Sequence, residues 1–473
     1  MTDAQTTDVV VIGSGPVGQT LAARAVRGGL TAVLVESELV GGECSYWACI
    51  PSKALIRSGA ALHAAQSLPG AREAITGSLD AQKVFARRDA MVANWDDSGQ
   101  AQGLAQAGIT LARGFGRISG EREVEVTAQD GTVTTIQARQ AVVIATGSVP
   151  VVPPINGLDE TPFWGTRALV AVDEVPESIT VIGAGAAGTE LAQAFSRLGA
   201  KVTIIARSGI LGGFPAPAVE IVGNAFEKEG IRVLTNTGVR SVAKNGENAV
   251  TVTLDSGDTI ESERLLVATG RRPALDGLGL EGLGLSPEGL PSDASGRVRG
   301  AGDWLYVIGD AADEVVLTHQ GKYEARAAGD AIAARAAGTL GDDIQPWSRF
   351  AATANSYAVP QVVFTDPEIA MAGRTLEQAL KAGVNASEVS LPIAVAGSAL
   401  HSEGYTGWAQ IVVDEDRKVI IGATFAGPEV AEMLHAATIA IAGEVPLDRL
   451  WHAVPSFPTV SEVWLRLLET YGL

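Results

Sequence analysis

Cys44 and Cys49 are the only cysteines of this 473-residue chain, and they lie within one hexapeptide that Lys53 follows four positions later. A disulfide between them would close a very short loop and remove little entropy from the unfolded chain, so a purely structural bond there would stabilise the fold weakly. A zinc site is the alternative, but it needs about four ligands, and no histidine or further cysteine stands nearby. The pair therefore predicts a redox-active disulfide.

The size and composition of the chain restrict the classes of protein to consider. The hydrophobic fraction of 46% is that of a globular protein, and the length suggests about three domains. With 35 basic and 54 acidic residues the net charge is −19, which argues against a nucleic acid or an anionic membrane as partner. The N-terminal residues show no targeting pattern, and no apolar run reaches the ~18 residues of a membrane span. We therefore expect a cytoplasmic protein, in which a disulfide is transient and catalytic.

One local pattern occurs twice, in residues 8–18 and in residues 178–188. In each copy a β-branched run leads into G-x-G-x-x-G, and a helix-like stretch and a second β-rich run follow. This arrangement binds dinucleotides, because the glycines let the backbone approach a pyrophosphate and the helix N-terminus attracts its charge. Two copies predict two bound nucleotides. The glycines concerned are Gly13, Gly15, Gly18, Gly183, Gly185 and Gly188.

The residue that follows the second β-rich run distinguishes the two nucleotides. Glu36 stands there in the first copy, and a carboxylate can accept both ribose hydroxyls of an unphosphorylated adenosine. Ala206 stands at the matching place in the second copy, with Arg207 next to it. A guanidinium would hold a 2′-phosphate that a glutamate would repel. We therefore predict that the second module prefers NADPH to NADH. The alternative is that Arg207 is a solvated surface charge.

The remaining segments indicate how the chain is divided. An apolar run ends in a tight turn at Gly147 and another at Gly270, as expected where a chain passes between domains. From about Pro346 no nucleotide fingerprint follows, and residues 410–413 and 419–422 alternate as in an antiparallel sheet. We predict an α/β fold with two Rossmann-like nucleotide-binding domains and a C-terminal α+β domain, in which residues 429–443 form a helix.

Taken in order, these motifs resemble one known family. The order is G-x-G-x-x-G, an acidic residue, GG-x-C-x4-C-x-PSK, ATG, a second G-x-G-x-x-G, ATGR, GD and a C-terminal PT-x-x-E. It resembles the flavoprotein disulfide reductases, also called class I pyridine nucleotide-disulfide oxidoreductases, over essentially the whole chain. The resemblance implies a discontinuous FAD-binding domain in residues 1–155 and 275–345, an NAD(P)H-binding domain in residues 156–274 and a dimerisation domain in residues 346–473.

The resemblance also assigns cofactors to the two modules. It implies that the first module binds FAD and the second binds the pyridine nucleotide, with Gly270 beside the latter. Along the FAD pyrophosphate and ribityl chain it implies Gly41, Gly42, Thr146, Gly147 and Asp310.

The resemblance further implies roles for the sulfur pair. Cys49 would be the thiolate next to the flavin, visible as charge-transfer absorption, and Cys44 would be the interchange thiol that meets the substrate. Lys53, one helical turn beyond Cys49, would pair with Glu190 near flavin N5. A helix N-terminus and a nearby lysine also favour a thiolate on physical grounds. The C-terminal region would form a homodimer interface that completes each active site with residues of the partner chain.

One departure from the family pattern bears on the substrate. Family members that act on dithiols read His-Pro-Thr-x-x-Glu near the C-terminus, where the histidine moves protons for the interchange thiol and the glutamate orients it. Here Phe457 replaces the histidine, and Glu462 remains. His452 and His319 are candidate substitutes, although a surface histidine is the plainer interpretation of each. Phe457 argues against efficient dihydrolipoamide or glutathione chemistry.

Two further departures concern sulfur and its surroundings. Mercuric reductases carry an additional C-terminal cysteine pair, and no cysteine follows Cys49 here, which argues against ordinary mercuric reduction. Ala48 replaces the usual glycine before Cys49, and Tyr46 and Trp47 precede it. These aromatics shape a substrate face or serve in packing.

Together the residues and the resemblance predict an NAD(P)H-dependent flavoprotein disulfide oxidoreductase without a metal. Electrons would pass from NADPH through FAD to the Cys44–Cys49 disulfide and on to a small disulfide or a related acceptor. Two alternatives stay open: a diaphorase-type reductase of quinones or metal ions, which needs no thiol protonation, and a flavin-binding redox sensor without turnover.

Overall fold

The computed structural model describes residues 5–246 and 249–473, so residues 1–4, part of the N-terminus considered for targeting, lie outside it. The chain divides into two compact units. The first comprises Met1–Pro51, Asp89–Val151 and Arg271–Asn355, and the second comprises Ser52–Arg88, Val152–Gly270 and Ser356–Leu473. The proposed limits of three domains stay a prediction. Among the described residues, no helix is long and apolar enough to cross a membrane.

A seven-stranded sheet forms the core of the first unit, with the order β3-β2-β1-β6-β5-β4 and with β16 also paired to β6. Strands β1, β2, β3, β6 and β16 pair in parallel, whereas β4 and β5 are antiparallel. The strands are β1 (Gln5–Ile12), β2 (Ala32–Glu36), β3 (Thr110–Arg113), β4 (Phe115–Gly120), β5 (Glu123–Thr127), β6 (Val133–Ile144) and β16 (Leu305–Val307). A small antiparallel pair joins β7 (Ser148–Pro150) to β15 (Arg271–Pro273).

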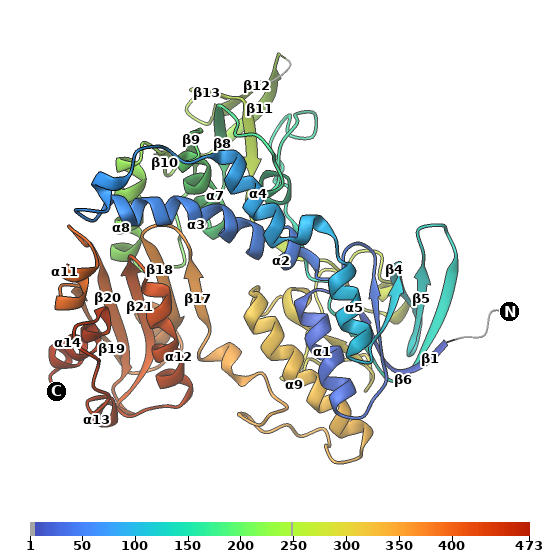
Figure 1. Cartoon of the computed structure of the whole chain (residues 1–473). Coiled ribbons are helices and arrows are strands. Elements are labelled where there is room, and N and C mark those ends of the chain that lie inside the picture. Colours follow the sequence, from blue (N-terminus) through green and yellow to red (C-terminus); the bar gives the residue numbers. More distant parts are fainter. Residues whose placement is uncertain (1–4, 247–248) are drawn as a thin grey trace. The chain divides into compact units, whose positions relative to one another are not determined.

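The central strands are apolar on both faces because helices and loops cover both. Val10 lies opposite Val33 on one side and Val142 on the other. Val9 and Val11 belong to the core that contains α1 (Pro16–Arg27) and α9 (Thr318–Ala336), and these two helices lie side by side (Figure 1). The other helices of this unit are α2 (Gly42–Tyr46) and α5 (Ser98–Gln106).

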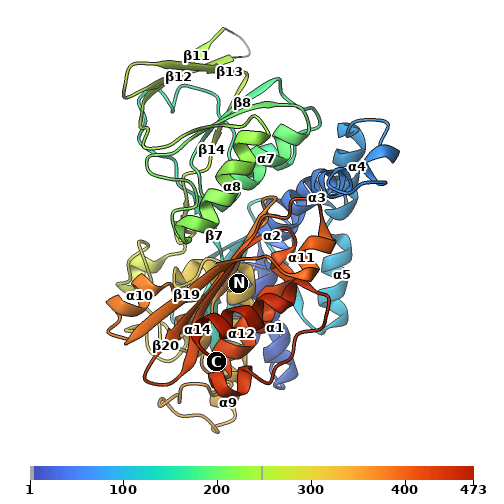
Figure 2. The ribbon, with the colours of Figure 1, turned by 90° about the vertical axis from the view of Figure 1, so that its left-hand side faces the viewer.

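The second unit contains a four-stranded parallel sheet with the order β10-β9-β8-β14. Helices α7 (Ala186–Arg197) and α8 (Ala216–Lys228) contribute to its core, and Figure 2 shows them beside β8 and β14. The strands are β8 (Ser178–Ile182), β9 (Lys201–Ile205), β10 (Arg232–Leu234) and β14 (Arg264–Val267). An antiparallel sheet of β11 (Val239–Asn245), β12 (Ala249–Leu254) and β13 (Thr259–Ser262), and helix α6 (Thr166–Val170), complete this region.

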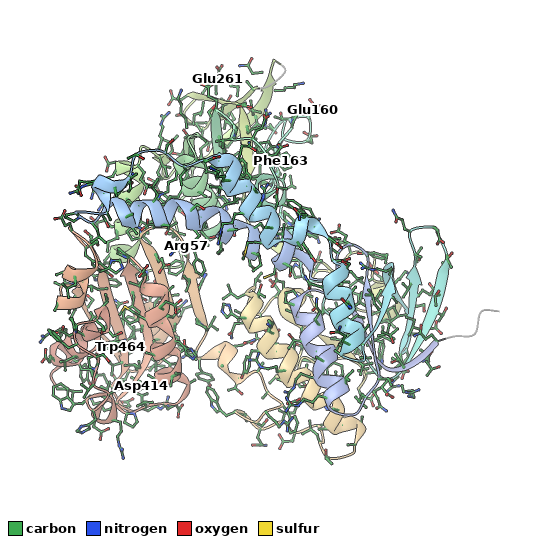
Figure 3. The ribbon with its side chains drawn as sticks, viewed as in Figure 1. Arg57, Glu160, Phe163, Glu261, Asp414 and Trp464 are labelled. Carbon is green, nitrogen blue, oxygen red and sulfur yellow. The ribbon has the colours of Figure 1, made fainter. Side chains whose placement is uncertain are left out.

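The C-terminal part of the second unit is an antiparallel sheet with the order β17-β18-β21-β20-β19. Trp464 of α14, labelled in Figure 3, packs against Phe425 of β21 with ring centroids 5.3 Å apart. The strands are β17 (Pro360–Val363), β18 (Glu368–Gly373), β19 (Ala386–Pro392), β20 (Trp408–Asp414) and β21 (Val419–Gly427). The helices are α10 (Leu376–Lys381), α11 (Ala396–His401), α12 (Leu434–Ala442), α13 (Leu447–Leu450) and α14 (Val463–Tyr471).

The predicted fold class is confirmed: two parallel α/β cores and a C-terminal antiparallel α+β region are present. The helix expected over residues 429–443 is shorter than predicted. Glu429 has a left-handed backbone with φ of 56°, a 3₁₀ turn covers Val430–Met433, and α12 begins only at Leu434.

Helix α3 (Cys49–Gln66) carries the predicted thiolate at its first residue, and side-chain ion pairs hold the helix near its C-terminal end. Nδ1 of His63 lies 2.7 Å from Oδ2 of Asp366, and this hydrogen bond raises the pKa of His63. Arg197 of α7 lies 2.9 Å from the same carboxylate and 2.6 Å from Glu229. The ions tie α3 to α7, and helix α4 (Ala81–Met91) contributes Val84 and Phe85 to the same hydrophobic core.

Candidate active site

The carboxyl ends of parallel strands bring the predicted nucleotide-binding residues of the first unit to one edge of the sheet. Gly13 follows β1, Glu36 ends β2, Thr146 and Gly147 follow β6, and Asp310 follows β16. These segments are far apart in sequence, so only the strand order explains their meeting.

The second unit repeats this edge. Gly183 follows β8, Ala206 and Arg207 follow β9, and Gly270 follows β14. The backbone bonds also match: Gly13 N donates to Val35 O, as Gly183 N does to Ile205 O. Arg207 is exposed at the turn after β9.

The glycines of each turn fit a pyrophosphate. A Cβ on Gly13 would lie 2.3 Å from the carbonyl oxygen of Ala145, and one on Gly18 would lie 2.0 Å from the carbonyl oxygen of Gly13. A Cβ on Gly15 or Gly185 would meet nothing within 4 Å, although each caps the N-terminus of its helix, α1 or α7. The outer glycines therefore serve packing, and the middle one leaves the helix N-terminus open to an anion.

Glu36 is oriented by the first glycine-rich turn. Its Oε2 accepts hydrogen bonds from the backbone N and the hydroxyl of Ser14, at 2.9 and 2.8 Å, and its Oε1 accepts from Glu38 N at 2.8 Å. The carboxylate is thus held at the edge where the ribose of a dinucleotide is expected.

The buried carboxylate of Glu324 anchors the Gly309–Asp310 turn. Oε2 of Glu324 on α9 accepts from Gly309 N at 2.6 Å, and Oε1 accepts from Asn355 Nδ2 at 2.7 Å. Burial raises the pKa of Glu324 to about 7. The clamp fixes the turn that presents Asp310.

Asp310 also joins a chain of polar contacts that ends beside the cysteines. Its Oδ2 accepts from the hydroxyl of Ser148 at 2.6 Å, and that hydroxyl accepts from Arg271 Nε at 2.8 Å. Arg271 then forms an ion pair with Glu43 at 3.4 Å, and Glu43 directly precedes Cys44. The hydroxyl of Thr146 donates to Ala274 O at 2.7 Å, next to the antiparallel pair of β7 and β15.

The two cysteines stand on successive helices, Cys44 within α2 and Cys49 at the start of α3. Gly41 and Gly42 precede Cys44 with φ of 121° and 57°, which glycine alone adopts at low cost. The Sγ of Cys49 lies 3.4 Å from the hydroxyl of Thr318, the first residue of α9. Two helix N-termini therefore meet at Cys49, an arrangement that stabilises negative charge.

Lys53 lies one turn after Cys49 on α3. Its Nζ is 2.6 Å from Oε2 of Glu190 on α7, and Oε1 of Glu190 accepts from Phe364 N at 2.9 Å. The ammonium also lies 5.0 Å from the centroid of the Phe364 ring. Glu190 is buried, whereas the Lys53 side chain is 38% exposed, so solvent reaches one partner of this ion pair.

The C-terminal motif has lost its proton-carrying group. Phe457 is 75% exposed and cannot carry a proton. Oε1 of Glu462 binds Arg466 at 2.8 Å, and within the described part of the chain its buried Oε2 has no hydrogen-bond partner. His452 is exposed after α13, whereas His319 is the second residue of α9, directly after Thr318.

Sequence reasoning missed Thr318, Glu324, Ser148 and Arg271 as parts of this site. Thr318 stands beside His319, and only the histidine is a candidate from its residue type. Ser148 and Arg271 immediately follow the two ATG runs, a signal that was available. Nothing in the sequence marks Glu324, because one glutamate within a long helix carries no pattern. No group of three or more His, Cys, Asp or Glu among residues 5–246 and 249–473 is placed to hold a metal ion.

Comparison with known proteins gives two matches to family models. The family described as "Pyridine nucleotide-disulphide oxidoreductase" matches residues 7–333, and its "dimerisation domain" matches residues 359–467.

Two curated relatives cover nearly the whole chain. A dihydrolipoyl dehydrogenase of Thermus scotoductus is 33% identical over 98% of this chain and 97% of its own length. A mercuric reductase of Shigella flexneri is also 33% identical, over 98% of this chain and 80% of its own length.

Among solved structures, the Cu(II) complex of the HOCl-induced flavoprotein disulfide reductase RclA from Escherichia coli has a TM-score of 0.83 at 23% identity. The match covers 98% of this chain and 99% of that one. LpdA from Mycobacterium tuberculosis has a TM-score of 0.82 at 24% identity, over 98% and 100% of the two chains. At this identity the likeness concerns the fold.

The glycine geometry predicts a separation of folding from cofactor binding. Gly15→Ala should leave the melting temperature nearly unchanged and weaken FAD binding at least about tenfold, because the methyl group occupies the open helix N-terminus. Gly185→Ala should retain FAD and raise the KM for the pyridine nucleotide by a similar factor. Flavin absorbance after gel filtration and steady-state kinetics measure the two effects.

Gly18→Ala is the matched control, because its methyl group collides with the backbone of Gly13 and should lower the melting temperature itself. Unchanged FAD affinity in Gly15→Ala would contradict the assignment of the first module.

Proposed function

Because the chain belongs to the pyridine nucleotide-disulphide oxidoreductase family, whose members bind FAD and a pyridine nucleotide, we propose that it is an NADPH-dependent reductase of a small disulfide. The observation that carries the proposal is the position of Cys49, whose thiol lies against Thr318 where α3 and α9 both begin. A thiolate is the nucleophile in disulfide exchange, and two helix N-termini favour it.

The proposed sulfur chemistry balances without a further reagent. Cys44 attacks one sulfur of the acceptor, which releases one thiol and leaves a mixed disulfide. Cys49 then attacks the sulfur of Cys44, re-forms the Cys44–Cys49 bond and releases the second thiol. Gly13, Gly15 and Gly18 would hold FAD, whose hydride chemistry would let NADPH return the cysteine pair to its dithiol form.

The pair of Lys53 and Glu190 has a supporting role in this proposal. The buried carboxylate holds the ammonium by an ion pair of 2.6 Å on the same helix as Cys49. A cation fixed one turn from the thiol stabilises the negative charge that develops there during exchange.

The preference for NADPH is supported by Arg207. It is exposed just beyond the carboxyl end of β9, one residue after the position that matches Glu36 of the first module. The backbone around it is held by Asn236 N, which donates to Ser208 O, and Thr237 N, which donates to Ala206 O, both at 2.9 Å. A guanidinium there can form charge-assisted bonds to a 2′-phosphate.

We also propose a homodimer through the C-terminal region. The dimerisation-domain match over residues 359–467 supports it, as do the exposed Val454 and Phe457 at 85% and 75%. Large exposed apolar side chains on one loop favour burial against a partner. Phe457 would then present a ring, and no proton donor, to the partner's site.

A second candidate is a reductase of quinones or metal ions. The absence of a proton-carrying side chain at Phe457 favours it, because these acceptors need no protonated thiol. Relatives include mercuric reductases, and RclA was solved with Cu(II), which is compatible with metal ions as acceptors.

Replacement of the interchange thiol distinguishes the two candidates. Cys44→Ser should abolish NADPH-dependent reduction of disulfides, because no mixed disulfide can form. Thiol release and NADPH oxidation are measured with a panel of disulfides, quinones and metal ions.

Ser45→Ala, a change at the neighbouring residue, is the matched control and should keep full activity. Unimpaired disulfide turnover by Cys44→Ser would refute the sulfur relay. Turnover of quinones or metal ions alone, by wild type and variant equally, would favour the second candidate.

Coenzyme choice tests Arg207. Arg207→Ala should lower kcat/KM for NADPH by roughly tenfold to a hundredfold and leave kcat/KM for NADH almost unchanged, because charge-assisted bonds to the phosphate are lost. Arg232→Ala, an exposed arginine at the start of β10, serves as control. If the wild type used NADH as well as or better than NADPH, the preference would be disproved.

A restored histidine tests the role of Phe457. Phe457→His should raise disulfide reduction near neutral pH by about tenfold or more, because a proton carrier then stands in the same motif as Glu462. Val454→His, at the most exposed neighbour, controls for a histidine elsewhere on the loop. No gain in Phe457→His would mean that proton transfer does not limit turnover.

A further inference from the structure

Three consecutive residues that are not glycine adopt a left-handed backbone. Ala93, Asn94 and Trp95 have φ values of 51°, 50° and 58°. Residues with a Cβ visit this region singly, because the Cβ crowds the following carbonyl oxygen. A run of three is strained, and such strain clusters at sites of function.

The left-handed turn places Trp95 against Trp47. Their ring centroids are 5.7 Å apart, and the ring planes are inclined by 33°. Trp47 directly follows α2, three positions after Cys44, and its backbone N–H still donates to Glu43 O, so it continues the turn that carries the thiol. Both indoles are only partly buried. An aromatic surface therefore adjoins the interchange thiol and is partly open to solvent.

The left-handed backbone of residues 93–95 is not needed to attach this segment to the rest of the unit. Oδ2 of Asp97 accepts from Val40 N at 2.6 Å, just before α2. Gln100 Nε2 donates to the hydroxyl of the buried Tyr46 at 3.0 Å, at the end of α2. These two contacts already attach the segment to the cysteine-bearing helix on both sides. The geometry of Trp95 thus serves the aromatic surface itself.

The charged groups around Trp47 and Trp95 favour acceptors without negative charge. Glu43 is paired with Arg271 at 3.4 Å, so its charge is largely compensated. Asp96, next to Trp95, is exposed, and the backbone N–H of Ser98 lowers the pKa of its carboxyl. With a net charge of −19 on the chain, a dianionic acceptor would be repelled.

We propose that Trp47 and Trp95 form the docking face for the acceptor, and that this acceptor is a small disulfide with flat aromatic substituents and no net negative charge. The inference rests on the proposed disulfide reductase and specifies its substrate class. Stacking on the indoles holds one acceptor sulfur beside Cys44. Cys44 and then Cys49 displace one aryl thiolate each, and NADPH supplies the two electrons.

The test compares disulfides on the FAD-loaded full-length protein. Dithiodipyridine is aromatic and uncharged, bis(hydroxyethyl) disulfide is aliphatic and uncharged, and dithiobis(nitrobenzoate) is aromatic and dianionic. Trp95→Leu should raise the KM for dithiodipyridine about threefold to tenfold and change the KM for bis(hydroxyethyl) disulfide less than about twofold. Trp95→Phe should keep the wild-type KM within about twofold.

Two controls accompany the variants. Trp347→Leu removes another exposed tryptophan with a left-handed backbone, φ of 61°, and should change none of the three KM values. Wild type should use dithiobis(nitrobenzoate) less well than dithiodipyridine at low salt, and the difference should shrink as salt screens the repulsion.

The outcomes separate this inference from the proposed function. Equal losses on aromatic and aliphatic disulfides in Trp95→Leu, or no loss on either, would overturn the docking face while the disulfide reductase stands. If Trp95→Leu did not fold, equal losses on both substrates in Trp95→Phe would overturn it in the same way. A wild type that reduced none of the three would remove the proposed function and this inference together.

Discussion

The close contact between each glycine-rich turn and its neighbouring strand is the constraint on which the rest of the molecule depends. At Gly13 the turn approaches the carbonyl of Ala145 so closely that a side chain cannot fit, and Gly183 approaches Ala268 in the same way. This contact sets the start of α1 and α7 at the carboxyl edge of each sheet. The other residues that we propose to face the nucleotides reach that edge because parallel strands end there together.

A family scaffold and an altered reactive group coexist in this chain. The glycine turns, the cysteine pair and the ion pair of Lys53 and Glu190 are the parts that we propose to form a flavoprotein relay. The C-terminal loop differs from the family pattern, because the phenyl ring of Phe457 cannot donate or accept a proton as an imidazole does. The parts that we propose to handle electrons lie on helices and sheet edges, whereas Phe457 lies on an exposed loop, so a change at Phe457 leaves the scaffold intact.

Much of the fold was predictable from the sequence because it follows from local repetition. Two G-x-G-x-x-G turns after β-branched runs specify two parallel cores, and the alternation near β20 and β21 specifies an antiparallel sheet. The contacts of Glu324 and Thr318 were not predictable, because they join segments that only tertiary packing brings together. The break before α12 escaped prediction too, since a glutamate carries no signal for the left-handed backbone found at Glu429.

The solitary thiol pair has a consequence for quantitative work on the protein. Cys44 and Cys49 are the only cysteines of the chain, and both belong to the proposed redox couple. A thiol-alkylating reagent therefore has no other cysteine to label. The mass of the alkylated intact protein then gives the fraction of chains in which the pair is oxidised. The labelled fraction would therefore report the oxidation state of the proposed couple without a correction for other thiols.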